Sequence, residues 1–184
     1  MSYTTVHTAR LELVPLDADA IEALLRGDAV RLRALTGAAF SASPAPPPYM
    51  ADSLPLVRDR LRASPEETEW WNWLILRQED CEALGSVAFG GAPDGDGAVL
   101  IGYAMYPDRE GHGYATEAVR AMVQWAFAQP GVRAVRALAP VWNTPAVHVA
   151  EKVGMRPVSA AEDDEVGEVL VYEIRLVPAF GGSA

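Results

Sequence analysis

Two glycines, Gly111 and Gly113, lie in the stretch of this sequence whose residue types are best suited to binding a phosphate. They follow an apolar run at 98–105 and precede a segment in which apolar residues recur at the spacing of one helix face. Glycine lets backbone N–H groups approach a ligand closely, and a helix N-terminus favours an anion. The order strand, glycine loop, helix therefore predicts a site for the phosphates of an anionic cofactor.

Two familiar phosphate-binding motifs do not fit this loop. No Gly-Lys-Ser/Thr follows the glycines, which excludes a P-loop, and the dinucleotide fingerprint is poor because Ala115 follows Gly113 after two residues. A second segment of interest, Asn143 to Met155, follows later and predicts a helix that begins at Asn143 and ends at Gly154. The glycine pair alone is weak evidence, so the interpretation depends on both segments.

Composition indicates a globular protein of ordinary domain size. The chain has 184 residues, half of them apolar and 22% charged, which is enough to bury a core. Its formal charge of −10 argues against a nucleic-acid partner, which would need a basic surface. The acidity is compatible with attraction of cationic substrates such as amines, and equally with a role in solubility alone.

The sequence predicts a cytoplasmic protein without a membrane anchor. No run approaches the roughly 20 apolar residues that span a bilayer, and the first residues lack the features of a secretory signal. The single cysteine, Cys81, cannot form an internal disulfide. Its acidic neighbours disfavour a reactive thiolate, and we expect no metal site.

The apolar patterns predict one mixed sheet with helices on its faces. A single domain is expected over residues 1–178, with a flexible tail at 179–184, and four prolines at 41–48 predict a surface loop. Trp70, Trp71 and Trp73 either line a substrate pocket or belong to the core, and the core is favoured. Strands are expected at 10–16, 70–76, 84–89, 99–105, 132–138 and 168–177, and helices after Asp17, at 54–61, at 115–126 and at 143–154.

Several short motifs recur along the chain in a fixed order. They are Arg10-Leu11-Glu12-Leu13, Ile101-Gly102-Tyr103, the run from Gly111 to Ala118, Asn143, and Glu151-Lys152-Val153-Gly154-Met155. Taken together they resemble the GNAT superfamily of acetyl-CoA-dependent N-acetyltransferases, and within it the branch of ribosomal-protein N-terminal acetyltransferases (RimJ/RimL-like). The resemblance covers nearly the whole chain. It implies an α/β (α+β) GNAT fold: a mixed, mostly antiparallel sheet of six to seven strands, splayed at the cofactor site, with about four helices.

The resemblance also implies roles for individual residues, with acetyl-CoA as the cosubstrate. A bulged strand would pair the main chain of Met105 and Tyr106 with the pantetheine arm, and Asn143 would contact the cofactor as well as cap its helix. Backbone N–H groups near Met105 and Tyr106 would hold the oxyanion of the tetrahedral intermediate. The pyrophosphate would be bound by the amides of Gly111, His112, Gly113, Tyr114, Ala115 and Thr116.

Three positions depart from the family pattern. Glu110 replaces the usual Gln or Arg, so its carboxylate is expected to point away from the phosphates, with Arg109 or His112 compensating. Ala146 replaces a usual serine, and Ala150 falls where many members have a tyrosine that protonates the departing CoA sulfur.

The last two of these departures remove both general acids that are familiar in the family. The motifs leave two catalytic candidates, Tyr106 and His148. His148 lies on the same helix as Ala150 and could replace the missing acid, but at two positions from Ala150 it is expected to face elsewhere. A general base is left open among Glu69, Glu168, Glu173 and a chain of water molecules.

The sequence as a whole predicts an N-acetyltransferase in which a neutral primary amine attacks the acetyl thioester directly. The acceptor is a protein N-terminus by nearest resemblance, or a small amine, and a homodimer is a further possible assembly. The alternative is a CoA-binding module that has lost catalysis. The missing serine and tyrosine support it, and so does the stretch from Val99 to Tyr106, which lacks the Glu that the family often has on this strand. A third hypothesis is an unrelated α/β domain with a chance glycine turn.

Overall fold

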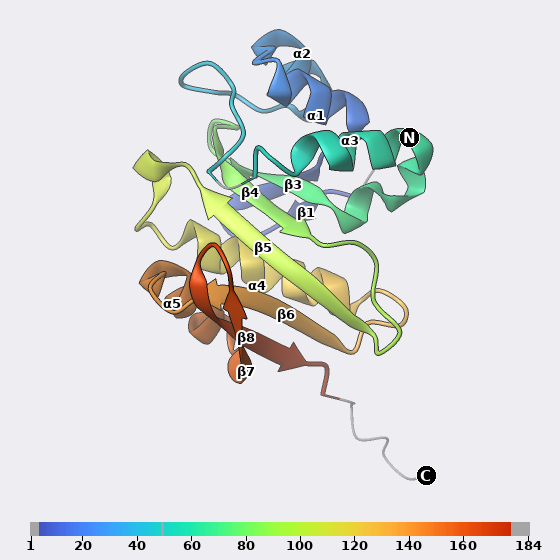
Figure 1. Cartoon of the computed structure of the whole chain (residues 1–184). Helices are drawn as coiled ribbons and strands as arrows, with labels where there is room; N and C mark the ends of the chain where they lie inside the picture. Colours follow the sequence, from blue (N-terminus) through green and yellow to red (C-terminus); the bar gives the residue numbers. More distant parts are fainter. Residues whose placement is uncertain (1–3, 49, 178–184) are drawn as a thin grey trace, which may run out of the picture.

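The computed structural model describes residues 4–48 and 50–177, so the predicted tail at 179–184 and the domain limit at 178 lie outside the described residues. One eight-stranded sheet runs through the molecule in the order β1-β2-β3-β4-β5-β6-β8-β7 (Figure 1). Every neighbouring pair is antiparallel except β5 and β6. The strands are β1 (Val6–His7), β2 (Leu11–Pro15), β3 (Asn72–Arg77), β4 (Ala83–Phe89), β5 (Ala98–Met105), β6 (Ala134–Pro140), β7 (Arg156–Asp163) and β8 (Gly167–Arg175).

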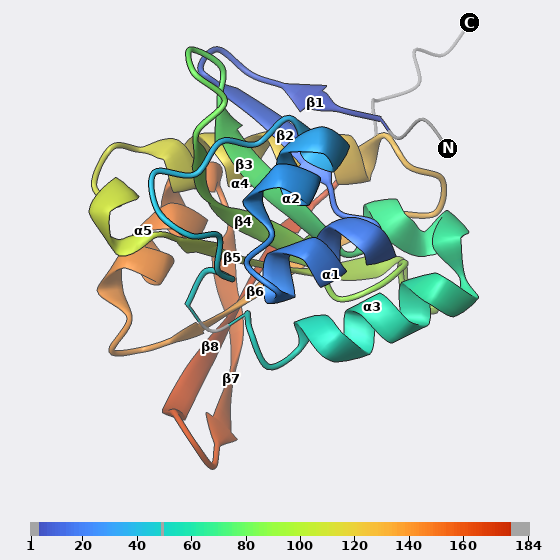
Figure 2. The same ribbon diagram turned by 90° about the horizontal axis from the view of Figure 1, so that it is seen from above.

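Helices cover both faces of this sheet. One face packs against α4 and α5, and the first three helices gather over the part of the other face that β2 to β4 form (Figures 1 and 2). This arrangement confirms the predicted mixed α/β class. The helices are α1 (Ala18–Leu25), α2 (Ala29–Thr36), α3 (Leu54–Ala63), α4 (Tyr114–Phe127) and α5 (Thr144–Val153), with short 3₁₀ helices at Pro65–Trp70 and Pro107–Arg109.

The element counts exceed the prediction of six to seven strands and about four helices, because three elements carry little apolar signal. The strand β1 has only two residues, and every residue of β7 is exposed, so neither shows a buried alternation. The helix α2 buries one side chain, Leu32. Periodicity detects an element through its buried face, and these elements have almost none.

The tryptophan cluster belongs to the core. Trp73 is fully buried and its indole N–H donates to the carbonyl oxygen of Glu69 at 2.9 Å. Trp70 and Trp73 lie with their ring centroids 5.1 and 5.3 Å from that of Trp125 on α4. Trp71 faces the opposite side, beneath the guanidinium of Arg60. The predicted strand at 70–76 therefore begins only at residue 72, after the 3₁₀ helix.

The sheet opens between β5 and β6. These parallel strands pair from Ala98 with Ala134 to Ile101 with Ala137, and the pairing stops there although both strands continue. On its other side β5 pairs with β4 in an unbroken register as far as Met105. The splay that the resemblance implied is present, whereas the bulge expected in this strand is absent from its pairing with β4.

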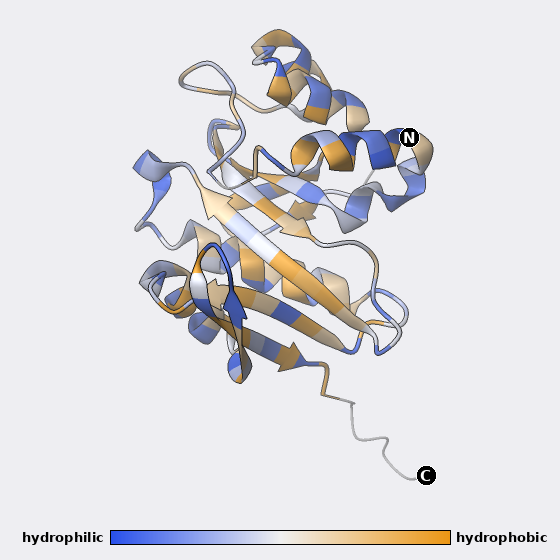
Figure 3. Ribbon diagram, viewed as in Figure 1, coloured by the Kyte–Doolittle hydropathy of each residue, from blue (hydrophilic) through white to orange (hydrophobic). Residues whose placement is uncertain are grey.

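Within the described ranges, no helix combines the length and the apolar character needed to cross a membrane. The same residues contain no group of three His, Cys, Asp or Glu side chains placed to hold a metal ion. Cys81 occupies the turn between β3 and β4 with a positive φ of 59°. Figure 3 shows the glycine loop as part of a hydrophilic connection after β5.

Candidate active site

The glycine loop has a left-handed backbone at both of its glycines. Gly111 and Gly113 have φ values of 78° and 77°, a region that other residues enter only with strain. Gly113 is also the residue that immediately precedes α4, and no side chain caps the helix there. The N-terminal amides of α4 are therefore left to another acceptor.

Six consecutive amides in this loop have no protein acceptor among the described residues. The first intrahelical bond of α4 runs from the N–H of Glu117 to the carbonyl of Gly113 at 3.1 Å. None of the N–H groups at 111–116 donates to a backbone or side-chain oxygen in the part of the chain that the structure describes. A row of unpaired donors at a helix N-terminus is a site for an anion with several oxygens, such as a diphosphate.

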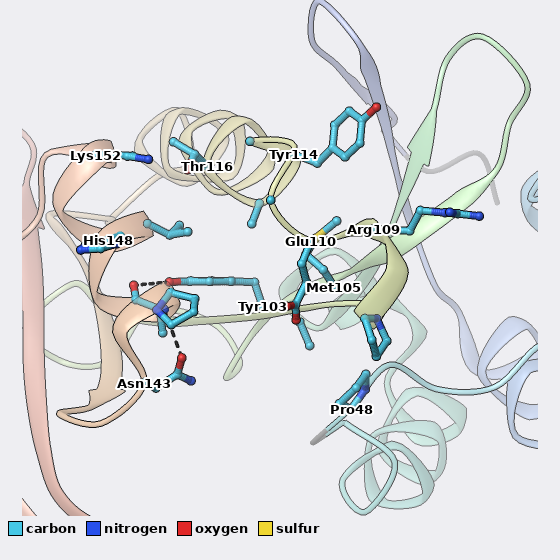
Figure 4. Close-up of a pocket in the computed structure, with 18 residues that line it drawn as sticks. Pro48, Tyr103, Met105, Arg109, Glu110, Tyr114, Thr116, Asn143, His148 and Lys152 are labelled. Carbon is cyan, nitrogen blue, oxygen red and sulfur yellow. Dashed lines mark hydrogen bonds between the residues drawn. The ribbon is translucent and has the colours of Figure 1, made fainter.

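The loop borders a cavity of ≈ 760 Å³ at the opening of the sheet (Figure 4). The floor is the free end of β5, one wall is the loop with the start of α4, and the other wall is α5. Pro48 approaches from the proline-rich loop, whose expected surface position is consistent with this contact. The principal lining residues are Tyr103, Ala104, Met105, Glu110, Gly111, Gly113, Tyr114, Ala115, Thr116, Asn143, Ala146, His148, Val149 and Lys152.

Most of the residues predicted for the site line this cavity, and two do not. Tyr106 and His112 are outside its lining. The Tyr106 hydroxyl donates to the carbonyl of Ala45 at 2.5 Å, and the His112 ring stacks on Tyr114. His148 does line the cavity, so the expectation that it faces elsewhere was wrong. Those that line it are Met105, Gly111, Gly113, Tyr114, Ala115, Thr116, Asn143 and His148.

The end of β5 presents its backbone to the cavity at Met105 and not at Tyr106. The N–H of Tyr106 donates to the carbonyl of Leu84 at 3.0 Å, so it is used within the sheet. Because backbone groups alternate along a strand, the N–H of Met105 turns the opposite way, towards the gap left by β6. Of the two amides expected to hold an oxyanion, Met105 alone has the orientation for it.

Tyr103 is a site residue that sequence reasoning assigned no role. It projects from β5 across the cavity, and its hydroxyl donates to the carbonyl of Ala146 on α5 at 2.8 Å (Figure 4). Burial raises the pKa of Tyr103 well above its ordinary value, so the phenol stays protonated. The Ile-Gly-Tyr motif contained the signal, but only the fold shows that the side chain bridges the gap between β5 and α5.

Asn143 caps α5 as expected. Its side-chain oxygen accepts a hydrogen bond from the N–H of Ala146 at 3.2 Å, and the residue also lines the cavity.

Asn143→Ala should lower the free energy of unfolding by about 1 kcal/mol, and thereby lower the melting temperature by about 2–4 °C. Asn143→Ser, which keeps a capping oxygen, should restore the melting temperature. If Asn143 also binds the cofactor, calorimetry should show weaker acetyl-CoA binding in both variants; unchanged affinity in both would limit the residue to capping.

Glu110 is the only carboxylate that lines the cavity in the described part of the chain. It forms no ion pair with the described residues. The compensation expected from Arg109 is absent, because that side chain pairs with Glu82 at 2.5 Å and with Asp108 at 3.2 Å. Glu110 therefore places a negative charge on a cavity that Arg109 and Lys152 also line, where the bound cosubstrate would be anionic.

Glu110→Gln is expected to tighten acetyl-CoA binding by about 2- to 5-fold, because it removes like-charge repulsion at a partly solvated distance. Isothermal titration calorimetry at low salt measures this directly. Glu79→Gln, an exposed turn residue remote from the cavity, is the matched control and should leave the dissociation constant unchanged. A 100-fold loss of turnover in Glu110→Gln would contradict this interpretation and make Glu110 a general base.

None of the three carboxylates considered as a base lines the cavity. Glu69 accepts a hydrogen bond from the N–H of Thr4 at 2.8 Å, near the opposite edge of the sheet. The pKa of Glu173 is lowered by its hydrogen bonds from Arg136 and Arg175, although burial opposes this shift. A carboxylate held charged in this way is a weak proton acceptor.

A comparison with known families agrees with this geometry. Residues 10–156 match the family described as "Acetyltransferase (GNAT) domain". The chain belongs to the GNAT acetyltransferase family. The matched region includes the end of β5, the glycine loop, α4 and α5, and so contains every residue of the cavity lining.

Two curated GNAT relatives from Bacillus subtilis (strain 168) are similar over part of their length. The uncharacterized N-acetyltransferase YjdG is 26% identical over 103 residues, which are 56% of this chain and 61% of the relative. The uncharacterized N-acetyltransferase YnaD is 32% identical over 83 residues, 45% of this chain and 48% of the relative. The matches thus span about half to three fifths of these relatives.

Solved GNAT structures share the fold over nearly the full chain. The RimL ribosomal L7/L12 alpha-N-protein acetyltransferase in complex with coenzyme A has a TM-score of 0.68 at 16% identity, covering 94% of this chain and 98% of that one. A spermidine N-acetyltransferase SpeG chimera from Vibrio cholerae and hSSAT has a TM-score of 0.65 at 13% identity, covering 91% and 96%. At this identity the likeness shows the fold.

Proposed function

We propose that this chain transfers the acetyl group of acetyl-CoA to a primary amine. The observation that carries the proposal is the row of six unpaired amides at 111–116, which borders the same cavity as the unpaired end of β5. A diphosphate fits the first feature and an extended amide chain fits the second. Acetyl-CoA contains both groups in one molecule. The volume of the cavity is also in the range of small-molecule sites.

Some groups of the cavity bind the cosubstrate, and one backbone donor acts in the reaction itself. The amides of the loop and the positive end of α4 hold the diphosphate. The free edge of β5 pairs with the amide groups of the pantetheine arm. The N–H of Met105 is the donor that would stabilise negative charge on the carbonyl oxygen when the amine attacks directly. The C–S bond would then break, CoA would leave as its thiolate, and the attacking nitrogen would lose its proton to solvent.

We further propose that the acceptor is an α-amine, as at a protein N-terminus, and not the side chain of lysine or a polyamine. An α-amine has a pKa near ~8 and is partly neutral at physiological pH, whereas a lysine amine near ~10.4 needs a base. The cavity supports this choice because its one lining carboxylate, Glu110, lies on the wall that the anionic cosubstrate would occupy. RimL acts on such an N-terminus, and SpeG acts on spermidine, according to their names.

The competing function is that of a CoA-binding module without turnover. It is favoured by Ala146 and Ala150, which carry no hydroxyl at the two α5 positions where family members commonly have one, and by the Tyr103 hydroxyl, which already donates to the carbonyl of Ala146. A thiolate is a fair leaving group by itself, and the loss of general acid catalysis slows a reaction by roughly 10²–10⁴-fold without abolishing it. The two functions therefore predict different results in a turnover assay.

A thiol-release assay with acetyl-CoA tests the proposal. The panel contains peptides with free N-termini, the same peptides with blocked N-termini but a lysine, free amino acids and spermidine. We expect release with free N-termini and little with blocked peptides or spermidine. A rise in melting temperature with acetyl-CoA but no turnover on any amine would support the binding module. The absence of that rise at saturating acetyl-CoA would refute both functions.

A further inference from the structure

A charged pair connects the first strands of the fold to the glycine loop. Arg10, just before β2, donates from Nε to Glu117 Oε2 at 2.7 Å, and its backbone N–H donates to Glu117 Oε1 at 2.9 Å. The hydroxyl of Thr8 donates to the same Oε1 at 2.6 Å. Burial would raise the pKa of Glu117, but these hydrogen bonds lower it below its ordinary value. Glu117 is therefore a charged anchor in the first turn of α4.

The guanidinium of Arg10 also contacts two residues of the loop, His112 and Tyr114, and lies beside the glycine between them. It donates to the carbonyl of His112 at 3.1 Å and lies 4.5 Å from the ring centroid of Tyr114. A Cβ atom built on Gly113 would lie 3.6 Å from Arg10 Nη2. Arg10 is absent from the cavity lining, although Gly113 and Tyr114 are part of it. It therefore contacts the loop from the side opposite the cavity.

The bond to His112 determines where the next amide points. In a trans peptide the C=O of one residue and the N–H of the following residue point in opposite directions. Because Arg10 holds the carbonyl of His112 behind the loop, the N–H of Gly113 must point away from Arg10, towards the cavity side. One side chain thus sets the orientation of an amide in the middle of the proposed phosphate site.

Arg10 also supplies a positive charge that this segment lacks. No lysine or arginine occurs between Glu110 and Arg120, whereas Glu110 and Glu117 are both acidic. The nearest cation before the loop, Arg109, is paired with Glu82 and Asp108. Without Arg10, the carboxylate of Glu117 would be left uncompensated in the first turn of α4, close to the proposed diphosphate.

We propose that Arg10 is a positioning residue for a diphosphate ester, acting through the loop at 111–116. It turns the Gly113 amide towards the cavity and neutralises Glu117, and it does not touch the ligand. The inference rests on the proposed function, since the diphosphate is that of acetyl-CoA. It predicts a specific loss: removal of the Arg10 side chain weakens the use of donors that contain a diphosphate and spares those that do not.

The test compares two acetyl donors, acetyl-CoA and S-acetylpantetheine, which has the same thioester and pantetheine arm but no diphosphate. In Arg10→Gln, kcat/KM for acetyl-CoA should fall about 10- to 30-fold, in line with the loss of one or two charge-assisted contacts. The kcat/KM for S-acetylpantetheine should change by less than about 2-fold. The affinity for CoA, measured by calorimetry, should fall by about the same factor as kcat/KM for acetyl-CoA.

Two further variants control this comparison. Arg26→Gln removes an exposed arginine that pairs with Glu22, remote from the cavity, and should leave both donors unaffected. Arg10→Lys keeps the charge without the fork of donors and should give a smaller loss, about 3- to 5-fold, again confined to acetyl-CoA. It also serves as the test variant if Arg10→Gln does not fold.

The possible outcomes separate this inference from the proposed function. Equal losses for both donors would mean general damage to the site and would overturn the positioning role. An Arg10 variant that uses acetyl-CoA as well as the native protein does would overturn it too. If the native protein neither binds nor uses acetyl-CoA, the proposed function fails first, and the inference fails with it.

Discussion

Gly113→Val is expected to weaken acetyl-CoA binding by about 10- to 100-fold in a protein that still folds. The residue has a φ of 77°, and a non-glycine residue there costs about 1–2 kcal/mol, more when it is β-branched. The loop is exposed and can relieve this strain by changing its backbone, which misaligns the amides on either side of Gly113. Each hydrogen bond lost to a charged phosphate is worth roughly 1.5–3 kcal/mol.

The matched control for this variant is Gly167→Val. Gly167 has a φ of 79° at the first residue of β8, next to the turn from β7, and no atom lies within 4 Å of the position of its added Cβ. Both variants should lower the melting temperature by a few degrees, about 2–4 °C per kcal/mol. Calorimetry with CoA should show a loss of affinity only in Gly113→Val. Equal affinities in the two variants would mean that the phosphates bind elsewhere.

Met105→Pro is expected to lower kcat by about 10²–10³-fold, the cost of removing one donor to a developing oxyanion. Proline removes the N–H that faces the gap and leaves the bonds between β4 and β5 in place, because Met105 directs its backbone groups away from β4. The KM for acetyl-CoA should change much less than kcat, since this donor acts most strongly in the transition state.

Loss of the methionine side chain complicates this variant, because Met105 is buried in the core. Met105→Ala removes the same side chain and keeps the N–H, so it isolates the effect of the amide. The alanine variant should lose stability but retain most of its kcat. Similar values of kcat in the proline and alanine variants would show that the N–H of Met105 takes no part in the reaction.

The predictions from sequence succeeded where a buried face produces a regular apolar pattern, or where a special backbone geometry requires a particular residue type. The helix expected over 115–126 is α4, at Tyr114–Phe127, because its apolar positions face the core without interruption. The stretch from Asp94 to Gly97 has the composition typical of a turn, and it forms one, in which Asp94 accepts from two backbone N–H groups. Gly111 and Gly113 were singled out because a residue without a Cβ lets the backbone approach a ligand. The same absence of a Cβ allows the positive φ values that both residues have.

The predictions failed where a side chain's role depends on long-range contacts. The separation of Arg10 and Glu117 by 107 positions gives no local pattern, and their contact appears only when β2 packs beside α4. His148 was expected to face away because Ala150 was assumed to point into the site, but Ala150 is buried in the core and His148 lines the cavity. The orientation of α5 about its axis is a tertiary property that its sequence does not contain.

The opening between β5 and β6 has a consequence for the dynamics of the empty protein. Past Ile101 and Ala137 the two blocks of the sheet have no ladder bonds between them, and the Tyr103–Ala146 hydrogen bond is one of the few links across the gap. Amides at such a seam exchange with solvent readily, because local opening breaks few contacts. A bound molecule that pairs with β5 acts there as a missing strand, so its arrival slows hydrogen exchange and raises stability by mass action. If acetyl-CoA pairs with β5 as proposed, the exchange rate of the β5 amides beyond Ile101 reports whether the cosubstrate is bound.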